Sequence, residues 1–120
     1  MTNVLLLGAG TIGRMIAELL TQSGEYKVRV GDTDVAALDR LKSKLGVETQ
    51  VVDAANETDL ASAMNGQVAV ISALTFALNP RVARAALEAG LSYFDLTEDV
   101  ETTRVVRTLE IGRASCRERV

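Results

Sequence analysis

Short apolar runs alternate along the chain with stretches in which apolar residues recur every three or four positions. A short apolar run between turn residues is typical of a buried strand, whereas the i, i+3, i+4 spacing is typical of one face of a helix. Strands are predicted at residues 3–7, 26–30, 47–53, 68–73 and 92–96. Helices are predicted at residues 12–22, 35–45, 57–64, 80–89 and 100–109.

The apolar positions of the first two helices predict the faces that pack on the strands. In the first helix these positions are Ile12, Met15, Ile16, Leu19 and Leu20. In the second helix they are Val35, Leu38, Leu41 and Leu45. In the last strand, both Tyr93 and Phe94 are expected in the core.

Capping residues predict where two of the helices begin and end. Thr33 or Asp34 is suited to cap the second helix, with Asp34 favoured, and Gly46 fits the left-handed position that follows its last turn. The fourth helix is expected to have Asn79 as its N-cap and Pro80 at its first helical position, where the missing N–H costs nothing.

Strands that alternate with helices predict an α/β fold with a parallel sheet. Crossover connections between parallel strands are right-handed, so the helices are expected on both faces of a doubly wound sheet. We expect the spatial strand order 3-2-1-4-5. No repeat or linker interrupts the pattern, and 120 residues are enough for one domain.

The composition excludes several classes of function. Hydrophobic residues make up 48% of the chain, the net charge is −3 and no basic stripe is present, so nucleic-acid binding has no support. No apolar run is long enough for a membrane span or a signal peptide, so we expect a cytoplasmic protein. The chain has no histidine and one cysteine, Cys116, which excludes a Ser/His or Cys/His nucleophile pair and predicts no metal site.

A glycine-rich motif, GAGTIG, follows the first predicted strand directly and opens the first helix. In the Rossmann-like fold, Gly8 permits the tight turn, Gly10 lets the backbone approach a pyrophosphate, and Gly13 allows close helix packing. The backbone N–H groups of Gly10, Thr11 and Ile12 would then face the phosphates at the positive end of the helix dipole. The alternative is a turn that only reverses the chain.

Asp32 lies 19 residues beyond Gly13, at the end of the second predicted strand. An acidic residue at this spacing binds the adenosine ribose hydroxyls and repels a 2′-phosphate. No Arg or Lys follows before Arg40, so NAD is favoured as the cofactor and NADP is the second choice. The alternative is that Asp32 or Asp34 only caps the second helix.

Residues that close the third and fourth strands are further candidates for the cofactor site. Asp53 and Ala54 would border the adenine, unless Asp53 is a solvated carboxylate at a strand end. Ser72, Ala73 and Leu74 are small or apolar and would leave room for the cofactor beside the glycine turn, unless they form an ordinary loop.

Thr97 and Glu98 follow the fifth predicted strand. Ligands bind at the carboxyl edge of such sheets, so both side chains are expected near the nicotinamide. The alternative is that this segment caps the next helix.

The last ten residues, IGRASCRERV, break the apolar pattern. The string resembles the translation of a common sequencing adapter, which in this frame ends at a stop codon. We therefore expect a native dinucleotide-binding domain at residues 1–109 and a non-native tail at residues 110–120. A natural basic C-terminal helix is the alternative. The ten residues 111–120 hold three Arg and one Glu, so residues 1–110 carry −5 rather than −3.

The second half of the chain carries several distinctive strings. They include VISAL at residues 70–74 and EAG at residues 88–90, and the more specific ones are the Asn-Pro helix start and YFDLTED at residues 93–99. Together these strings resemble the saccharopine dehydrogenase-like family, and the resemblance extends over residues 3–109.

The resemblance implies an NAD(P)-dependent oxidoreductase that acts on the C–N bonds of amino acids, with an amino-acid or oxo-acid substrate. It implies that the cofactor is lined by Gly8, Gly10, Gly13, Asp32, Ser72, Ala73 and Leu74, with Thr97 and Glu98 near the nicotinamide. It also implies a substrate domain that is absent from this sequence, so we expect an inactive fragment of a longer parent, itself a candidate homodimer. No catalytic residue is assigned.

Two other functions share the glycine turn and the acidic residue. One is a nucleotide-sensing regulatory module of a potassium-transport system, and the other is an NAD(P)-sensing transcriptional regulator. A mixed α/β substrate domain beyond Leu109 would distinguish the enzyme from both.

Overall fold

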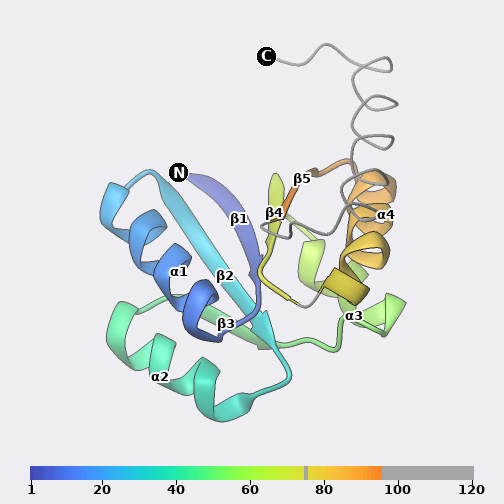
Figure 1. Cartoon of the computed structure of the whole chain (residues 1–120). Helices are drawn as coiled ribbons and strands as arrows, with labels where there is room; N and C mark the ends of the chain where they lie inside the picture. The colour runs from blue at the N-terminus through green and yellow to red at the C-terminus, as the bar shows by residue number, and fades with distance from the viewer. Residues whose placement is uncertain (75, 96–120) are drawn as a thin grey trace.

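A computed structural model describes residues 1–74 and 76–95 of the chain. Its five strands form one parallel sheet in the order β3-β2-β1-β4-β5, which confirms the predicted topology (Figure 1). The strands are β1 (Thr2–Leu7), β2 (Tyr26–Asp32), β3 (Glu48–Val51), β4 (Ala69–Ser72) and β5 (Ser92–Asp95).

Four helices and one 3₁₀ turn connect the strands. They are α1 (Thr11–Ser23), α2 (Val35–Leu45), α3 (Glu57–Met64), the turn η1 (Phe76–Leu78) and α4 (Asn79–Ala89). Figure 1 shows α1 and α2 on one side of the sheet and α3 and α4 on the other, as the doubly wound fold requires. The helix predicted at residues 100–109 lies outside the described residues.

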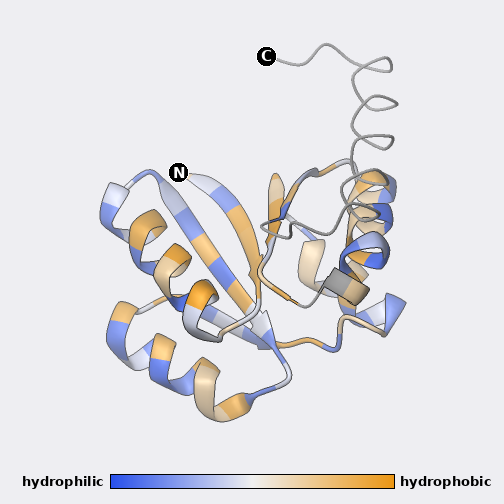
Figure 2. Cartoon of the chain, in the orientation of Figure 1, coloured by the Kyte–Doolittle hydropathy of each residue, from blue (hydrophilic) through white to orange (hydrophobic). Residues whose placement is uncertain are grey.

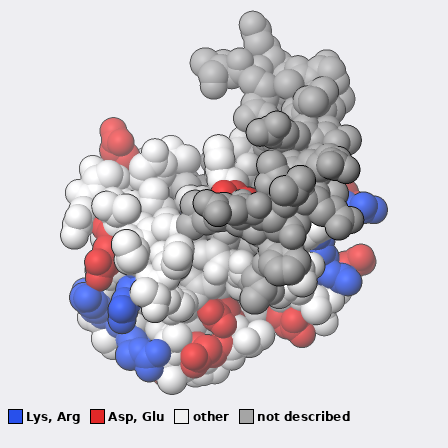
Figure 3. Space-filling model, in the orientation of Figure 1, with Lys and Arg blue, Asp and Glu red and all other residues white. Residues whose placement is uncertain are grey.

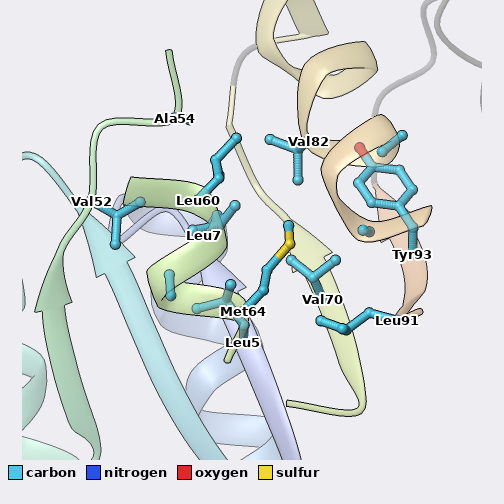
Figure 4. Close-up of a cluster of buried hydrophobic side chains, with 13 residues drawn as sticks. Leu5, Leu7, Val52, Ala54, Leu60, Met64, Val70, Val82, Leu91 and Tyr93 are labelled. Carbon is cyan, nitrogen blue, oxygen red and sulfur yellow. The ribbon is translucent and has the colours of Figure 1, made fainter. Parts of the chain in front are cut away.

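Strand β1 lies at the centre of the sheet and contributes side chains to the core on each face. Leu5 pairs in register with Arg29 of β2 and with Val70 of β4. Because side chains alternate along a strand, Leu5 and Leu7 face α3 and α4, whereas Leu6 faces α1 and α2. Figure 4 shows the first of these two cores, in which Leu60 and Met64 of α3 pack against Leu5 and Leu7.

The end of α2 is confirmed, but the start of α4 is not as predicted. Asp34 caps α2 by accepting a hydrogen bond from the N–H of Ala37 at 3.2 Å, and Gly46 closes the helix with φ +71°. Asn79 is not an N-cap: α4 begins at Asn79 itself, directly after η1, and Leu78 takes the cap position. The Asn79 side chain is buried instead, because Ser72 supplies it with a partner inside the fold.

The face of α1 that meets the sheet differs from the prediction. Gly13 and Ala17 are buried, whereas Ile12, Met15 and Leu19 are 54–67% exposed. Figure 2 shows hydrophobic segments, in orange, along the length of α1. Small residues four positions apart let the helix lie close to the strands, which moves the larger side chains to its flanks. The prediction held for the two remaining positions, since Ile16 and Leu20 pack against the core.

Two other apolar residues were placed wrongly by the pattern. Val35 is 53% exposed at the first position of α2. Phe94 is 52% exposed, although its neighbour Tyr93 is buried as predicted. Phe94 pairs with Ile71 on the side of the sheet where α1 and α2 pack mainly against β1, β2 and β3. Across residues 1–74 and 76–95, no helix has the length and apolar content of a membrane span.

Candidate functional site

The turn between β1 and α1 depends on Gly8 and Gly13. Gly8 has φ +109°, and its N–H donates to the carbonyl oxygen of Gly31 at 2.8 Å. A Cβ at Gly8 would lie 2.9 Å from the carbonyl oxygen of Ala73, and a Cβ at Gly13 would overlap the carbonyl of Gly8. The protein's own packing therefore requires both glycines.

Gly10 is different, because nothing in the part of the chain that the structure describes requires a glycine there. Its φ of −76° is open to any residue, and no described atom lies within 4 Å of the position that its Cβ would take. Gly10 is also the N-cap of α1 and offers no side chain to the first-turn N–H groups. The first turn of an α-helix has N–H groups without a partner inside the helix, so the start of α1 at Gly10 fits a bound pyrophosphate.

Asp32 joins the end of β2 to this turn. Its Oδ2 accepts a hydrogen bond from the N–H of Ala9 at 2.6 Å, and its Oδ1 accepts one from the N–H of Asp34 at 2.9 Å. Asp34, and not Asp32, caps α2. An ionised carboxylate has about four acceptor positions, so Asp32 retains capacity for the hydroxyls of a ribose.

The register places the candidate residues along one edge of the sheet. Leu7 pairs with Gly31 and with Ser72, and Ser72 pairs with Asp95, so the strands end together beside the glycine turn. The N–H of Ala73 donates to the carbonyl oxygen of Leu7 at 2.8 Å, which places Ala73 against the turn.

The residues after β3 have local partners. The Oδ1 of Asp53 accepts from the N–H of Ala55 at 2.9 Å, and the N–H of Asp53 donates to Asp59 at 3.0 Å. Asp53 is exposed, whereas Ala54 is buried in the core beneath α3 and α4. Asp53 shapes its own loop, and contact of Asp53 and Ala54 with an adenine stays a prediction.

A buried polar contact that the pattern did not reveal holds the loop after β4. Ser72 and Asn79 are each 1% exposed, and the Ser72 hydroxyl donates to Asn79 Oδ1 at 2.6 Å. Leu74, between them in sequence, packs against the core. The only sequence signal was the pair of polar residues at the two ends of an apolar loop.

Tyr93 lies next to this contact. Burial, with the negative charge of Asp95 beside it, raises the pKa of the Tyr93 phenol far above its usual value of 10.0. Tyr93 therefore stays neutral at every physiological pH and is a residue of the core. Its hydroxyl faces Asp95 and Ser72.

Thr97 and Glu98 lie outside the described residues. In the part of the chain that the structure describes, no three His, Cys, Asp or Glu side chains are placed to hold a metal ion. What the described residues can do is bind and orient a ligand at the carboxyl edge of β1, β2 and β4.

Solved structures with this fold include dehydrogenases. A saccharopine dehydrogenase (L-Glu forming) from Saccharomyces cerevisiae superposes with a TM-score of 0.79 and 21% identity over 91% of this chain and 24% of that chain. A scyllo-inositol dehydrogenase from Lactobacillus casei with bound NAD(H) and scyllo-inositol superposes with a TM-score of 0.77 and 20% identity. This match covers 96% of this chain and 34% of that chain. The chain thus spans about a quarter of the length of the first protein and about a third of the length of the second.

The family model described as the saccharopine dehydrogenase NADP binding domain matches residues 4–118. The match confirms the family resemblance and a nicotinamide dinucleotide, NAD or NADP, as the cofactor. The division of the chain at residues 109 and 110 stays a prediction. With its glycine turn, its acidic residue at the end of β2 and its sheet order, the chain belongs to the saccharopine dehydrogenase NADP-binding domain family.

Proposed function

We propose that this chain is the cofactor-binding part of an oxidoreductase that acts on the C–N bonds of amino acids. The observation that carries the proposal is Gly10, whose missing side chain serves no purpose in the packing of residues 1–74 and 76–95. A glycine that this packing does not require, at the N-terminus of a helix, supports a bound pyrophosphate.

The remaining parts of the dinucleotide are assigned along the sheet edge. The N–H groups of Gly10, Thr11, Ile12 and Gly13 hold the pyrophosphate, and Asp32 accepts from the adenosine ribose. Asp53 and Ala54 border the adenine. Ser72, Ala73 and Leu74 lie on the nicotinamide side, with Thr97 and Glu98 nearby.

The bound dinucleotide would supply the hydride chemistry, and the residues of this chain would orient it. The loop that holds Ala73 is well suited to orientation, because Ser72 and Asn79 fix it from inside the fold. Ala73 also packs against Gly8, so the loop and the glycine turn keep a constant spacing.

The C–N chemistry rests on the family and not on a described catalytic group. We propose an amino-acid or oxo-acid substrate, bound by a further domain of a longer, homodimeric, cytoplasmic parent. The chain alone is then expected to bind a dinucleotide without hydride transfer.

Titration of the full chain with NADH and NADPH, followed by the reduced nicotinamide's fluorescence, tests the proposal. Saturable binding of at least one dinucleotide is expected, and the Gly10→Val variant is expected to lose it while keeping its melting temperature. No saturable binding of either dinucleotide would overturn the proposal. Turnover of an amino acid by the chain alone would overturn the assignment of the substrate site to another domain.

A further inference from the structure

One face of the sheet is covered over only part of its width. On the side of α1 and α2, paired residues form a row from Leu6 of β1 through Ile71 of β4 to Phe94 of β5. Leu6 is fully buried, Ile71 is partly buried and Phe94 is 52% exposed. Among the described elements, α4 has the main helix contacts to β5, and it lies on the opposite side of the sheet (Figure 1).

The outer flank of α1 borders these uncovered strands. Ile12, Met15 and Leu19 are 54–67% exposed, and their spacing of three and four residues places them on one face of the helix. Glu18 lies on the other flank, because its carboxylate bridges Lys44 of α2 at 2.9 Å. The buried small residues of α1 face the sheet, so the apolar stripe faces away from α2, toward the β4–β5 half of the sheet.

The stripe and the strands together form an apolar step. Its wall is Ile12, Met15 and Leu19 of α1, and its floor is Ile71 and Phe94. An aromatic side chain has about 150–250 Å² of surface, so Phe94 presents about 100 Å². With three aliphatic side chains at similar exposure, the step supplies about half of the roughly 800 Å² that each partner of a typical dimer buries. This is enough for the apolar centre of an interface with a polar rim.

The apolar step contains no charged residue. Figure 3 shows uncharged side chains, in white, over α1, whereas Lys and Arg gather over the α2 part of the surface. A charged partner is attracted by charges of opposite sign, and the step offers none. In a two-fold symmetric dimer the same patch meets its own copy, so a charge within it would repel itself. An uncharged apolar patch avoids this repulsion, which favours a second copy of the chain as the occupant.

We propose that the apolar step is the interface of a homodimer of this chain. Leu19 of one copy packs on Ile71 and Phe94 of the partner subunit, and the same contact recurs in the opposite direction. Each α1 then takes the place of a third helix on the other copy's sheet, since a helix about 10 Å wide spans two strands that lie about 4.8 Å apart. The inference does not depend on the proposed cofactor, because Leu19 and Phe94 are not among the residues assigned to it.

Sedimentation velocity of the full chain measures the association. Twice the mass of one chain is expected at about 100 µM, because interfaces of standard size give micromolar or tighter dissociation constants. The dimer should persist in about 1 M salt, which screens contacts between exposed charges but not apolar ones. A reducing agent is present throughout, so that the thiol of Cys116 cannot link two chains.

Two lysine variants show whether the apolar step makes the contact. Leu19→Lys is expected to weaken the dimer at least about tenfold, because it places a charge in an apolar interface. Val35→Lys is the matched control, since Val35 is 53% exposed on α2 and lies outside the step. It should dimerise like the unchanged chain. Both variants should keep the melting temperature and the NADH affinity of the unchanged chain.

A mixing experiment tests the reciprocity of the contact. Phe94→Glu alone is also expected to weaken the dimer at least about tenfold. Mixed with Leu19→Lys, it should form a heterodimer that is at least about tenfold tighter than either variant alone. In that heterodimer one of the two contacts joins opposite charges, and the other keeps both original side chains.

Three results would overturn the inference. A monomer at about 100 µM would leave the step to residues beyond position 95 of the same chain or to a different protein. A dimer that Leu19→Lys and Val35→Lys weaken equally would have its contact elsewhere. Assemblies larger than a dimer would contradict a symmetric contact, which closes after two copies. None of these results bears on the proposed function, which titration with NADH and NADPH tests separately.

Discussion

The carboxylate of Asp32 accepts a hydrogen bond from the N–H of Ala9 across 2.6 Å, which ties the end of β2 to the glycine turn. One side chain therefore shapes the glycine turn and, in the proposed function, also binds the ribose of the dinucleotide. The two tasks are separable, since the first affects the stability of the domain and the second affects the choice of ligand.

Asp32→Ala is expected to lower both stability and NADH affinity. The N–H of Ala9 loses its partner in a residue that is only 7% exposed, which costs about 1–3 kcal/mol of unfolding free energy. NADH should weaken more than NADPH, because only NADH offers a free 2′-hydroxyl. Urea unfolding and fluorescence titration measure the two effects. Asp39→Ala, an exposed residue on α2, is the control, and an equal loss in both variants would contradict the prediction.

Gly10→Ala and Gly13→Ala are expected to separate ligand binding from folding. Gly10→Ala should leave the free energy of unfolding within about 0.5 kcal/mol of the unchanged chain, as for other surface changes, while it weakens dinucleotide binding. Gly13→Ala should cost more than about 2 kcal/mol, because its Cβ would overlap the Gly8 carbonyl. Denaturant unfolding curves of the two variants measure this difference in stability. A Gly10→Ala variant less stable than Gly13→Ala would refute this account of the turn.

Asn79→Ala tests the buried contact with Ser72. Losing the partner of a buried hydroxyl and leaving a small cavity should cost about 2–3 kcal/mol of unfolding free energy. Asn56→Ala is the matched control, since Asn56 caps α3 through Asp59 and a lost cap costs about 1 kcal/mol. If chemical denaturation gives the same loss of unfolding free energy for Asn79→Ala and Asn56→Ala, Asn79 contributes no more than a helix cap.

Glu48 gives the stability a modest dependence on pH. A hydrogen bond from Arg29 at 2.7 Å holds the pKa of this carboxyl below its usual value of 4.5. A lowered pKa stabilises the fold above the unfolded value, and this contribution is lost as the pH falls below 4.5 through the folded value. The pair is partly exposed, so Glu48→Gln should cost less than about 1 kcal/mol at pH 7.

Unfolding of Glu48→Gln and of the unchanged chain, measured from pH 7 down to acid, checks this. The difference should be present at neutral pH, shrink below pH 4.5, and decrease when salt is added. A difference that grows as the pH falls would contradict the assignment.

The topology was predictable because each strand and helix has its own periodicity, and because parallel crossovers have one hand. The orientation of α1 was not, since apolar spacing alone cannot tell a buried Ala17 from an exposed Leu19. The close approach of α1 to β1 depends on the contact between Gly13 and Gly8. The spacing of apolar residues gives no information on that contact.

The candidate site was predictable to the same extent. The glycines and Asp32 have fixed places in a local motif, so their positions followed from spacing. The contact between Ser72 and Asn79 did not, because it joins two elements across a loop and replaces a local cap. The exposed Phe94 was missed because the side chains that cover a strand are set by the layers of the fold.

The central position of β1 also affects how the chain is made. Its partner β4 begins at Ala69, so the second edge of β1 stays unpaired until the segment between Leu7 and Ala69 has been synthesised. Until then β1, β2 and β3 form a half-sheet whose open edge can pair with another nascent chain. Aggregation during synthesis should therefore depend on the interval between translation of Leu7 and of Ser72, and slow codons within it should lower the yield of folded protein.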